Sequence, residues 1–301
     1  MSIKKHYSYD NHEKDWESIL KDSSGRELAE TWLRNDTLDY WRHQKIRSPI
    51  EPIALSDKSS GWLTIGDGRF GSDAHYLLSL GVKSVHSSDI SDALLKVGHD
   101  KGYINDFSIE NAEAISFADD SFDYVYCKES FHHCPRPYIA LHEMFRVAKK
   151  AVVIAEPWDE IADRPPFYFL LRLLKIFLGK KNSNHGFESV GNYVYTISPR
   201  EVEKFSLGMH YTKVAFFSVN DAYLPGVEYV PIKAKNLTDF LLKCKLFGRI
   251  FALDALCFLG IKRPSILISI MFKSEPSQGL ITSLQELGWR FKDLPKNPYR
   301  T

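Results

Sequence analysis

A glycine-rich loop contains the first residues whose types and spacing suggest chemistry. Gly66, Gly68 and Gly71 form a GxGxxG pattern between a short apolar segment, 62–65, and a segment with helical spacing of apolar residues, 72–80. Glycines at a strand-to-helix turn allow the backbone to bend sharply and to approach a bound nucleotide-like ligand. The pattern by itself also fits NAD- and FAD-binding proteins, or a simple tight turn.

Asp89 lies about 20 residues beyond the loop, where a second predicted strand, 83–89, ends. A carboxylate at this position can accept two hydrogen bonds from a ribose diol. The alternative is that Asp89 balances the positive end of a helix that begins after Ser91. The glycine loop upstream favours ribose binding, so the two features together predict a nucleoside-binding site.

A third block, residues 111–137, distinguishes between the cofactors that the glycine loop could bind. It reads NAEAISFADDSFDYVYCKESFHHCPRP. This block resembles the class I, Rossmann-like S-adenosylmethionine-dependent methyltransferases of the small-molecule type (methyltransferase type 11-like), whose pattern D-A-E-x-L-P-F-x-D-x-S-F-D-x-V is followed by L-H-H. The resemblance covers about residues 60–157. A nicotinamide- or flavin-dependent oxidoreductase, the alternative for the glycine loop, has no reason to carry this block.

The resemblance implies S-adenosyl-L-methionine as the cofactor and S-adenosyl-L-homocysteine as its product. It also implies roles for the residues of the first two motifs. The backbone of Gly66, Asp67 and Gly68 is expected to face the methionine part and the sulfonium. Asp89 is expected to hold the ribose, and Ile90 to pack on the adenine.

The third block completes the cofactor site that the resemblance implies. Asn111 is expected to contact the adenine amino group, and the backbone N–H of Ala112 to meet the ring. Glu113 is expected to lie just outside, and Lys128 to line the methionine moiety. The family usually has aspartate in place of Asn111, but the side-chain carbonyl oxygen of asparagine can also accept a hydrogen bond from an amino group.

Two further positions depart from the family pattern. Thr64 stands where the family usually has an acid, and Phe70 stands where glycine is common. These departures support one alternative from another functional class, a non-catalytic relative that binds the cofactor, or nothing, and serves as a scaffold.

Methyl transfer from a sulfonium is an in-line displacement, so the protein must align the reactants and exclude water, and no metal is required. An oxygen or nitrogen nucleophile also needs a base near neutral pH. Our candidates are His133, after the fourth predicted strand, and His185, where this fold usually builds a substrate lid. His132 is interpreted as a structural or capping residue. Glu156 is a further candidate because it ends the fifth predicted strand.

Short apolar strands alternate with helical segments in the central part of the chain, which is typical of a parallel sheet with helices on both faces. The predicted fold class is α/β, a doubly wound, mostly parallel seven-stranded sheet with the last strand antiparallel, N-terminal helices and helical insertions between strands 5 and 7. The predicted domain organisation is an N-terminal helical extension and linker (1–60), a methyltransferase domain (61–273) and a C-terminal tail (274–301). Insertions 158–200 and 221–262 are expected to cover and select the substrate.

The composition excludes several classes of function. The chain has a formal net charge of +1, which gives no reason to expect a nucleic-acid partner. Its N-terminus has no apolar segment typical of a secretory signal, and no apolar run is long enough for a transmembrane helix. The four cysteines have no CxxC spacing, so we expect reduced thiols in a cytoplasmic protein rather than a disulfide framework or a zinc site.

Residues 167–181 include the most apolar predicted helix, in which Arg172 and Lys175 share a face. One interpretation is an interfacial helix that touches a membrane or a lipid-linked substrate. The interpretation we favour is a core or cover helix whose basic side chains reach solvent.

We therefore expect methylation of an oxygen or nitrogen of a small molecule or sugar-type metabolite. The alternative is a peripheral-membrane methyltransferase that acts on a quinone or a lipid-linked glycan.

Overall fold

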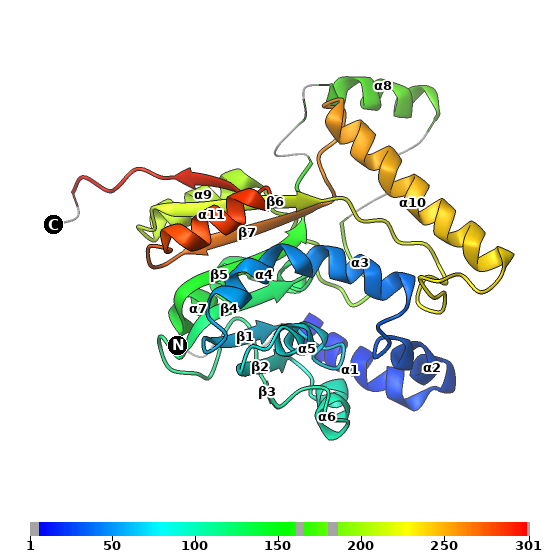
Figure 1. The fold of residues 1–301 in the computed structure, drawn as a ribbon, viewed down its shortest axis with the longest axis horizontal. Coiled ribbons are helices and arrows are strands. Elements are labelled where there is room, and N and C mark those ends of the chain that lie inside the picture. Colours follow the sequence, from blue (N-terminus) through cyan, green and yellow to red (C-terminus); the bar gives the residue numbers. More distant parts are fainter. Residues whose placement is uncertain (1–5, 161–164, 166, 180–185, 300–301) are drawn as a thin grey trace.

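The computed structural model describes residues 6–160, 165, 167–179 and 186–299. Its centre is one mixed sheet with the strand order β3-β2-β1-β4-β5-β7-β6-β8 (Figure 1). The strands are β1 (Gly61–Ile65), β2 (Ser84–Asp89), β3 (Asp106–Ile109), β4 (Phe122–Lys128), β5 (Ala148–Pro157), β6 (Lys213–Val219), β7 (Ile266–Phe272) and β8 (Arg290–Asp293). The first five strands are mutually parallel, and β7 lies antiparallel between β5 and β6. The predicted doubly wound α/β class is confirmed.

The sheet has an eighth strand where the sequence indicated a tail. Residues 274–301 contain α11 (Gln278–Glu286) and β8, which pairs antiparallel with β6. Most side chains of β8 are exposed and charged, as is common for an edge strand, so the strand has no apolar alternation to reveal it. Trp289 is buried and donates its indole N–H to the carbonyl oxygen of Pro49 at 2.9 Å. This segment is therefore part of the folded domain.

Alternating side chains of the strands build two apolar layers, one on each face of the sheet. Trp62 of β1 packs in a cluster with apolar residues of α4 (Glu51–Ser56), α5 (Ser72–Ser79) and α11. Its neighbour Leu63 packs on the other face with α7 (Pro137–Val147) and α9 (Pro199–Gly208). Both faces are covered, which fixes the carboxyl ends of the parallel strands as the accessible edge for a ligand.

The N-terminal region consists of four helices and a short turn. The helices are α1 (Tyr7–Lys21), α2 (Ser23–Thr31), α3 (Leu38–Arg47) and α4, with a 3₁₀ turn at Ser48–Ile50. Residues 48–56, near the end of the predicted extension and linker (1–60), are helical, and Ile50, Ile53 and Ala54 are fully buried. Pro49 and Pro52 each lie in the first turn of a helix, where a missing N–H costs nothing.

A buried ion pair attaches α3 to the sheet domain. Arg47 Nε lies 2.5 Å from Asp73 Oδ1 at the beginning of α5, and the guanidinium also donates to Ser72 Oγ at 2.7 Å. Both side chains of the pair are under one tenth exposed. The first helices are therefore bound to the domain through its interior.

Two long insertions form an arm that projects from the sheet (Figure 1). It contains α8 (Tyr168–Phe177) and α10 (Leu237–Phe258), and α10 packs on α3 through Leu246, Ile250 and Phe247. The favoured interpretation of the 167–181 helix as a core or cover helix is wrong for its described apolar side chains, because Phe169, Leu173 and their neighbours are exposed. Among the described residues, no helix combines the length and the apolar character that crossing a bilayer requires.

We predict that Arg47→Met lowers the free energy of unfolding by about 3 kcal/mol, because it leaves the Asp73 carboxylate buried without its nearest cation. Urea unfolding followed by tryptophan fluorescence measures the change. The double variant Arg47→Met/Asp73→Asn is expected to recover part of the loss.

The matched control is Arg34→Met, which breaks an ion pair with Asp36 whose two side chains are 38% and 55% exposed. This exposed pair is expected to contribute less than about 1 kcal/mol. Equal losses in the two single variants would contradict a special role for the buried pair.

Candidate active site

A cavity of about 380 Å³ lies at the carboxyl ends of β1, β2 and β4. Its size falls within the usual range for small-molecule sites. Loops that follow these strands form one wall. The N-terminal helices α1, α2 and α3 form the opposite wall, through Tyr9, His12, Trp16, Trp32, Asp39 and His43. No sequence pattern predicts that the N-terminal helices cover this edge of the sheet.

The predicted cofactor residues divide into two groups in the structure. Seven of them line the cavity: Gly66, Asp67, Gly68, Asp89, Ile90, Ala112 and Lys128. Asn111 and Glu113 do not. Asn111 Oδ1 accepts the backbone N–H of Glu113 at 2.9 Å, and the wholly buried Glu113 is paired with Arg136. The geometry therefore gives no support for an adenine contact by Asn111, and Glu110 lines the cavity near this turn instead.

The glycine loop is packed so closely that it has no room for a side chain at Gly66 or Gly68. Gly66 has a φ of +70°, and a Cβ atom there would lie 1.7 Å from Ser130 Oγ. A Cβ atom at Gly68 would lie 2.8 Å from the Trp16 ring and 2.9 Å from Asp89 Oδ2. Phe70 adopts a φ of +59° and is buried beneath α1 and α2. The departure at position 70 is therefore accommodated within the tight turn.

Asp67 turns its carboxylate away from the cavity and caps α5. It accepts the backbone N–H groups of Asp73 at 2.9 Å and Ala74 at 2.8 Å, and the hydroxyl of Thr64 at 2.9 Å. Burial and the nearby Asp73 carboxylate raise the pKa of Asp67 to about 7. An acid at position 64 would place a third carboxylate beside those of Asp67 and Asp73. Thr64 avoids this repulsion and donates a hydrogen bond to Asp67 instead. The N-cap residue of α5 is Gly71, which has no side chain to cap the helix itself.

Asp89 is a buried carboxylate at the rim of the glycine loop. Its Oδ1 accepts the backbone N–H of Ser91 at 3.1 Å. Burial raises the pKa of Asp89 to about 7, although hydrogen bonds from the backbone of Ser91, Ile90 and Gly68 act to lower it. Hydroxyl groups of a ligand that donate to this carboxylate would favour its ionised form.

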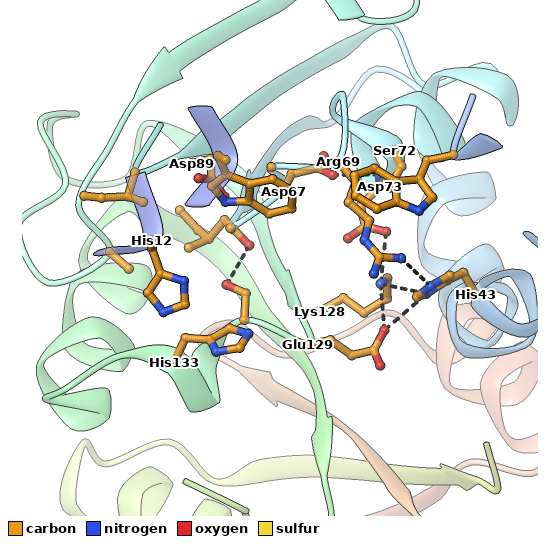
Figure 2. A pocket seen from close by; sticks show the side chains of 18 of the residues that line it. His12, His43, Asp67, Arg69, Ser72, Asp73, Asp89, Lys128, Glu129 and His133 are labelled. Atoms are coloured by element: carbon orange, nitrogen blue, oxygen red, sulfur yellow. Dashed lines mark hydrogen bonds and ion pairs between the residues drawn. The ribbon is translucent and has the colours of Figure 1, made fainter. Parts of the chain in front are cut away.

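Charged side chains gather at the end of β4. Lys128 Nζ lies 3.0 Å from Glu129 Oε2 and 3.7 Å from Asp73 Oδ1, while His43 Nδ1 lies 3.2 Å from Glu129 (Figure 2). Burial acts to raise the pKa of Glu129, but Lys128 and His43 outweigh it and hold that pKa well below its usual range. Positive and negative groups therefore both face this end of the cavity, which suits a zwitterionic ligand.

His133 lies on the opposite side of the cavity, beside His12 (Figure 2). Its Nδ1 is 2.7 Å from Glu188 Oε2, and Asn192 donates to the same carboxylate oxygen at 3.0 Å. The hydrogen bond from His133 lowers the pKa of Glu188 to about 2. The carboxylate is thus ionised at neutral pH and orients the imidazole. Glu188 lies in the insertion 158–200 and was not among the predicted site residues. The candidate His185 lies outside the described residues.

Glu156 and His132 act together as supports for the turn that carries His133. The Glu156 carboxylate is fully buried, and it accepts the backbone N–H groups of Ser130 at 3.0 Å and Phe131 at 2.9 Å. His132 Nδ1 lies 2.6 Å from its other oxygen. Burial lowers the pKa of His132, but Glu156 outweighs this effect and the pKa is raised. Glu156 does not line the cavity, so the structure gives it no role as a base.

One cluster at the cavity has the residue types of a metal site. His132, His133 and Glu188 each place a possible ligand atom within 4.8 Å of the others. The hydrogen bonds to Glu156 and between His133 and Glu188 already account for this proximity. We therefore assign no metal to these residues.

Comparison with known proteins identifies the domain that contains this cavity. Residues 63–155 match the model of a family described as a methyltransferase domain. The chain carries a class I, S-adenosylmethionine-dependent methyltransferase domain. The cofactor of the domain is S-adenosylmethionine. The glycine loop, Asp89 and the end of β4 all lie within the matched part of the chain.

A curated relative of the methyltransferase is the ubiquinone/menaquinone biosynthesis C-methyltransferase of Bartonella bacilliformis. It is 32% identical over 132 residues, which cover 40% of this chain and 51% of the relative. The chain thus matches about half the length of that protein.

The fold of the chain is similar to that of a solved structure. The YcgJ protein of Bacillus subtilis has a TM-score of 0.50 and 19% identity, and the match covers 78% of this chain and 100% of that one. The magnesium protoporphyrin IX methyltransferase of Synechocystis, solved with bound S-adenosylhomocysteine, has a TM-score of 0.47 and 15% identity, with 64% and 86% covered.

We predict that the affinity of the protein for S-adenosylhomocysteine falls as the pH decreases from 7.5 to 5.5. Burial raises the pKa of Asp89 to about 7, and only the ionised carboxylate would accept two hydrogen bonds from a ribose bound there. Below pH 7 a proton must leave before the nucleoside binds, so the affinity is expected to fall by more than about tenfold over this range. Calorimetry at each pH measures the change.

The control is Asp89→Asn, whose side chain does not titrate. Its affinity is expected to be weaker than that of the wild type at pH 7.5 but constant over the range. An equally steep pH dependence in this variant would assign the effect to another group.

Proposed function

We propose that the protein transfers a methyl group from S-adenosylmethionine to an oxygen or nitrogen of a small-molecule or sugar-type metabolite, with His133 as the general base. The observation that carries the proposal is the Glu188–His133 pair, which lines the same cavity as the glycine loop and Asp89. A base and a nucleoside-binding wall in one cavity are the two requirements of methyl transfer to a protonated nucleophile.

The cavity fits the cofactor in charge. Gly68 and Asp89 line it side by side, and Trp16 lies so close to Gly68 that a Cβ atom there would clash with its ring. A ribose beside this glycine would meet the Asp89 carboxylate. The amino-acid end of the cofactor is a zwitterion, and the group formed by Lys128, Glu129 and His43 offers partners of both signs. Trp16 and Trp32 would exclude water from the opposite side.

The proposed proton transfer uses one defined tautomer of His133. When Nδ1–H donates to the ionised Glu188 carboxylate, Nε2 carries the lone pair that accepts the proton of the acceptor O–H or N–H. The acceptor atom then attacks the methyl carbon as the carbon–sulfur bond breaks, and S-adenosylhomocysteine remains. Glu188 stabilises the resulting imidazolium. His12 lies beside His133 in an edge-to-face contact with ring centroids 5.0 Å apart, and it has a pKa lowered by burial and by His133.

A second candidate acceptor is a quinone-type ring. The specific observation in its favour is the 32% identity to a protein named as a ubiquinone/menaquinone biosynthesis C-methyltransferase. The same base would serve it, because removing the proton from a ring hydroxyl makes the neighbouring ring carbon nucleophilic. This candidate changes the acceptor atom and leaves the roles of Asp89 and His133 unchanged.

We predict that His133→Ala lowers the rate of methyl transfer by about 100-fold or more, the usual contribution of a positioned base. Radiolabelled methyl incorporation from S-adenosylmethionine into an extract of small molecules and lipids provides the assay. Glu188→Gln is expected to cause a smaller loss, since it retains a hydrogen-bond partner but removes the charge. Both variants are expected to bind S-adenosylhomocysteine within about threefold of wild type, because neither residue lies at the ribose.

The matched control is His142→Ala, a histidine on α7 that does not line the cavity. It is expected to retain the wild-type rate. Full activity of His133→Ala would exclude it as the base, and absence of heat on mixing the wild-type protein with S-adenosylhomocysteine would overturn the proposed function itself.

A further inference from the structure

The helix α10 presents a continuous apolar stripe to solvent. The large apolar residues of the stripe recur with helical spacing and are between 53% and 91% exposed. They are Leu237, Phe240, Leu241, Phe251, Phe258 and Leu259. Between them on the same face lie only small side chains, Cys244, Gly248 and Ala255. The opposite face of α10 is already used, because Leu246 and Ile250 are buried against the α3 side of the molecule.

The helix α8 extends this apolar surface. Seven of its described apolar side chains, counting the residue that follows the helix, are between 46% and 86% exposed. They are Phe169, Leu170, Leu173, Leu174, Ile176, Phe177 and Leu178. The backbone N–H of Phe167 donates to the carbonyl oxygen of Gly260 at 3.0 Å, so the start of α8 is joined to the end of α10 (Figure 1). We call these two helices the apolar arm.

Basic side chains lie on one flank of the apolar stripe. At 100° per residue, Lys245 lies next to the stripe and Arg249 lies one position farther round the helix, and both are exposed. The exposed Asp254 lies on the other flank, where it accepts a hydrogen bond from Asn220 at 2.7 Å, and Asp239 lies farther from the stripe. Apolar residues bordered by cations are the usual pattern of a helix that lies in the surface of an anionic bilayer.

We propose that the apolar arm docks on an anionic lipid bilayer and that the methyl acceptor is a lipid-embedded molecule; the second part rests on the proposed function. A bilayer fits better than a second copy of the chain because the neighbouring pairs Phe169–Leu170 and Leu173–Leu174 of α8 point in different directions and all four side chains are exposed. A single protein partner would cover one arc of such a helix, whereas lipid can surround it. With 10 residues, α8 is about 15 Å long, so it lies in the interface and does not span it.

The arm is fixed to the helix that lines the cavity. Trp41 of α3 packs on Phe247 of α10, with ring centroids 4.7 Å apart, and Leu38 of α3 joins the same cluster. Asp39 and His43 of that helix line the cavity. A bilayer that contacts the arm is thus one packed helix away from the site, which suits an acceptor whose head group leaves the membrane surface while its tail remains embedded.

Vesicle co-sedimentation of the full chain tests the proposal. The probe is phosphatidylcholine vesicles with and without phosphatidylglycerol, and no cofactor is added. The wild type is expected to bind the mixed vesicles, and Phe251→Glu/Phe258→Glu to lower the partition coefficient by more than about tenfold, because two apolar anchors are replaced by anions. Lys245→Glu/Arg249→Glu is expected to remove the preference for the anionic lipid.

The matched control is Tyr299→Glu, which changes an aromatic residue that is 90% exposed but lies outside the arm. It is expected to bind vesicles as the wild type does. Vesicle binding that survives Phe251→Glu/Phe258→Glu, or is absent in the wild type, would overturn the proposal. A dimer of the wild type in the absence of lipid, measured by light scattering, would also overturn the proposal if Phe251→Glu/Phe258→Glu converted it to monomers. In that case a second copy of the chain would cover the arm.

Affinity for S-adenosylhomocysteine is measured on the same samples by calorimetry. Because Phe251 and Phe258 lie on solvent-exposed positions of α10, all arm variants are expected to bind it like the wild type. Loss of this binding in the wild type would reject the proposed function but leave the vesicle result standing. The failures of the two proposals are therefore distinguishable.

Discussion

Asp67 and Asp73 both lie buried at the beginning of α5, where their two carboxylates repel one another. Partners from several elements offset this repulsion. Arg47 of α3 and Lys128 at the end of β4 lie close to Asp73, and backbone N–H groups of α5 donate to Asp67. Because a buried charge needs partners in good geometry, these contacts fix α3, the glycine loop and β4 relative to one another. The two walls of the cavity are thus held together by the need to pair the same carboxylates.

The parallel strands of the sheet could be predicted because each has a recognisable apolar sequence pattern. Segments such as Ala151–Ala155 are short, apolar and bounded by helices with regular spacing, and the glycine loop marks the first crossing from strand to helix. The strand β8 could not be predicted, since an edge strand with charged side chains resembles a loop. The position of the N-terminal helices over the cavity could not be predicted either. Trp16 lies over Gly68 only through tertiary packing, which leaves no periodic trace in the sequence.

The candidate site was predictable where one short motif places a residue directly after a strand. Asp89 and Lys128 reach the cavity for this reason. Asn111 does not, because its side-chain oxygen accepts the backbone N–H of Glu113 within the turn. The partner of His133 could not be found from sequence, since Glu188 comes from an insertion without regular elements around it. Such a pairing of distant residues depends on the folded chain.

The helix α1 connects the two chemical halves of the cavity. His12 lies beside His133, and Trp16, one helical turn further, lies against Gly68. The same helix holds the insertion that supplies Glu188, because Tyr7 donates to the carbonyl oxygen of Gly191 at 2.8 Å and Asn11 to that of Val190 at 2.9 Å. A helix that touches both the wall proposed for the nucleoside and the proposed base sets the distance between them. In the proposed methyl transfer this distance would decide whether the acceptor atom lies in line with the sulfonium, so the N-terminal region would contribute directly to alignment.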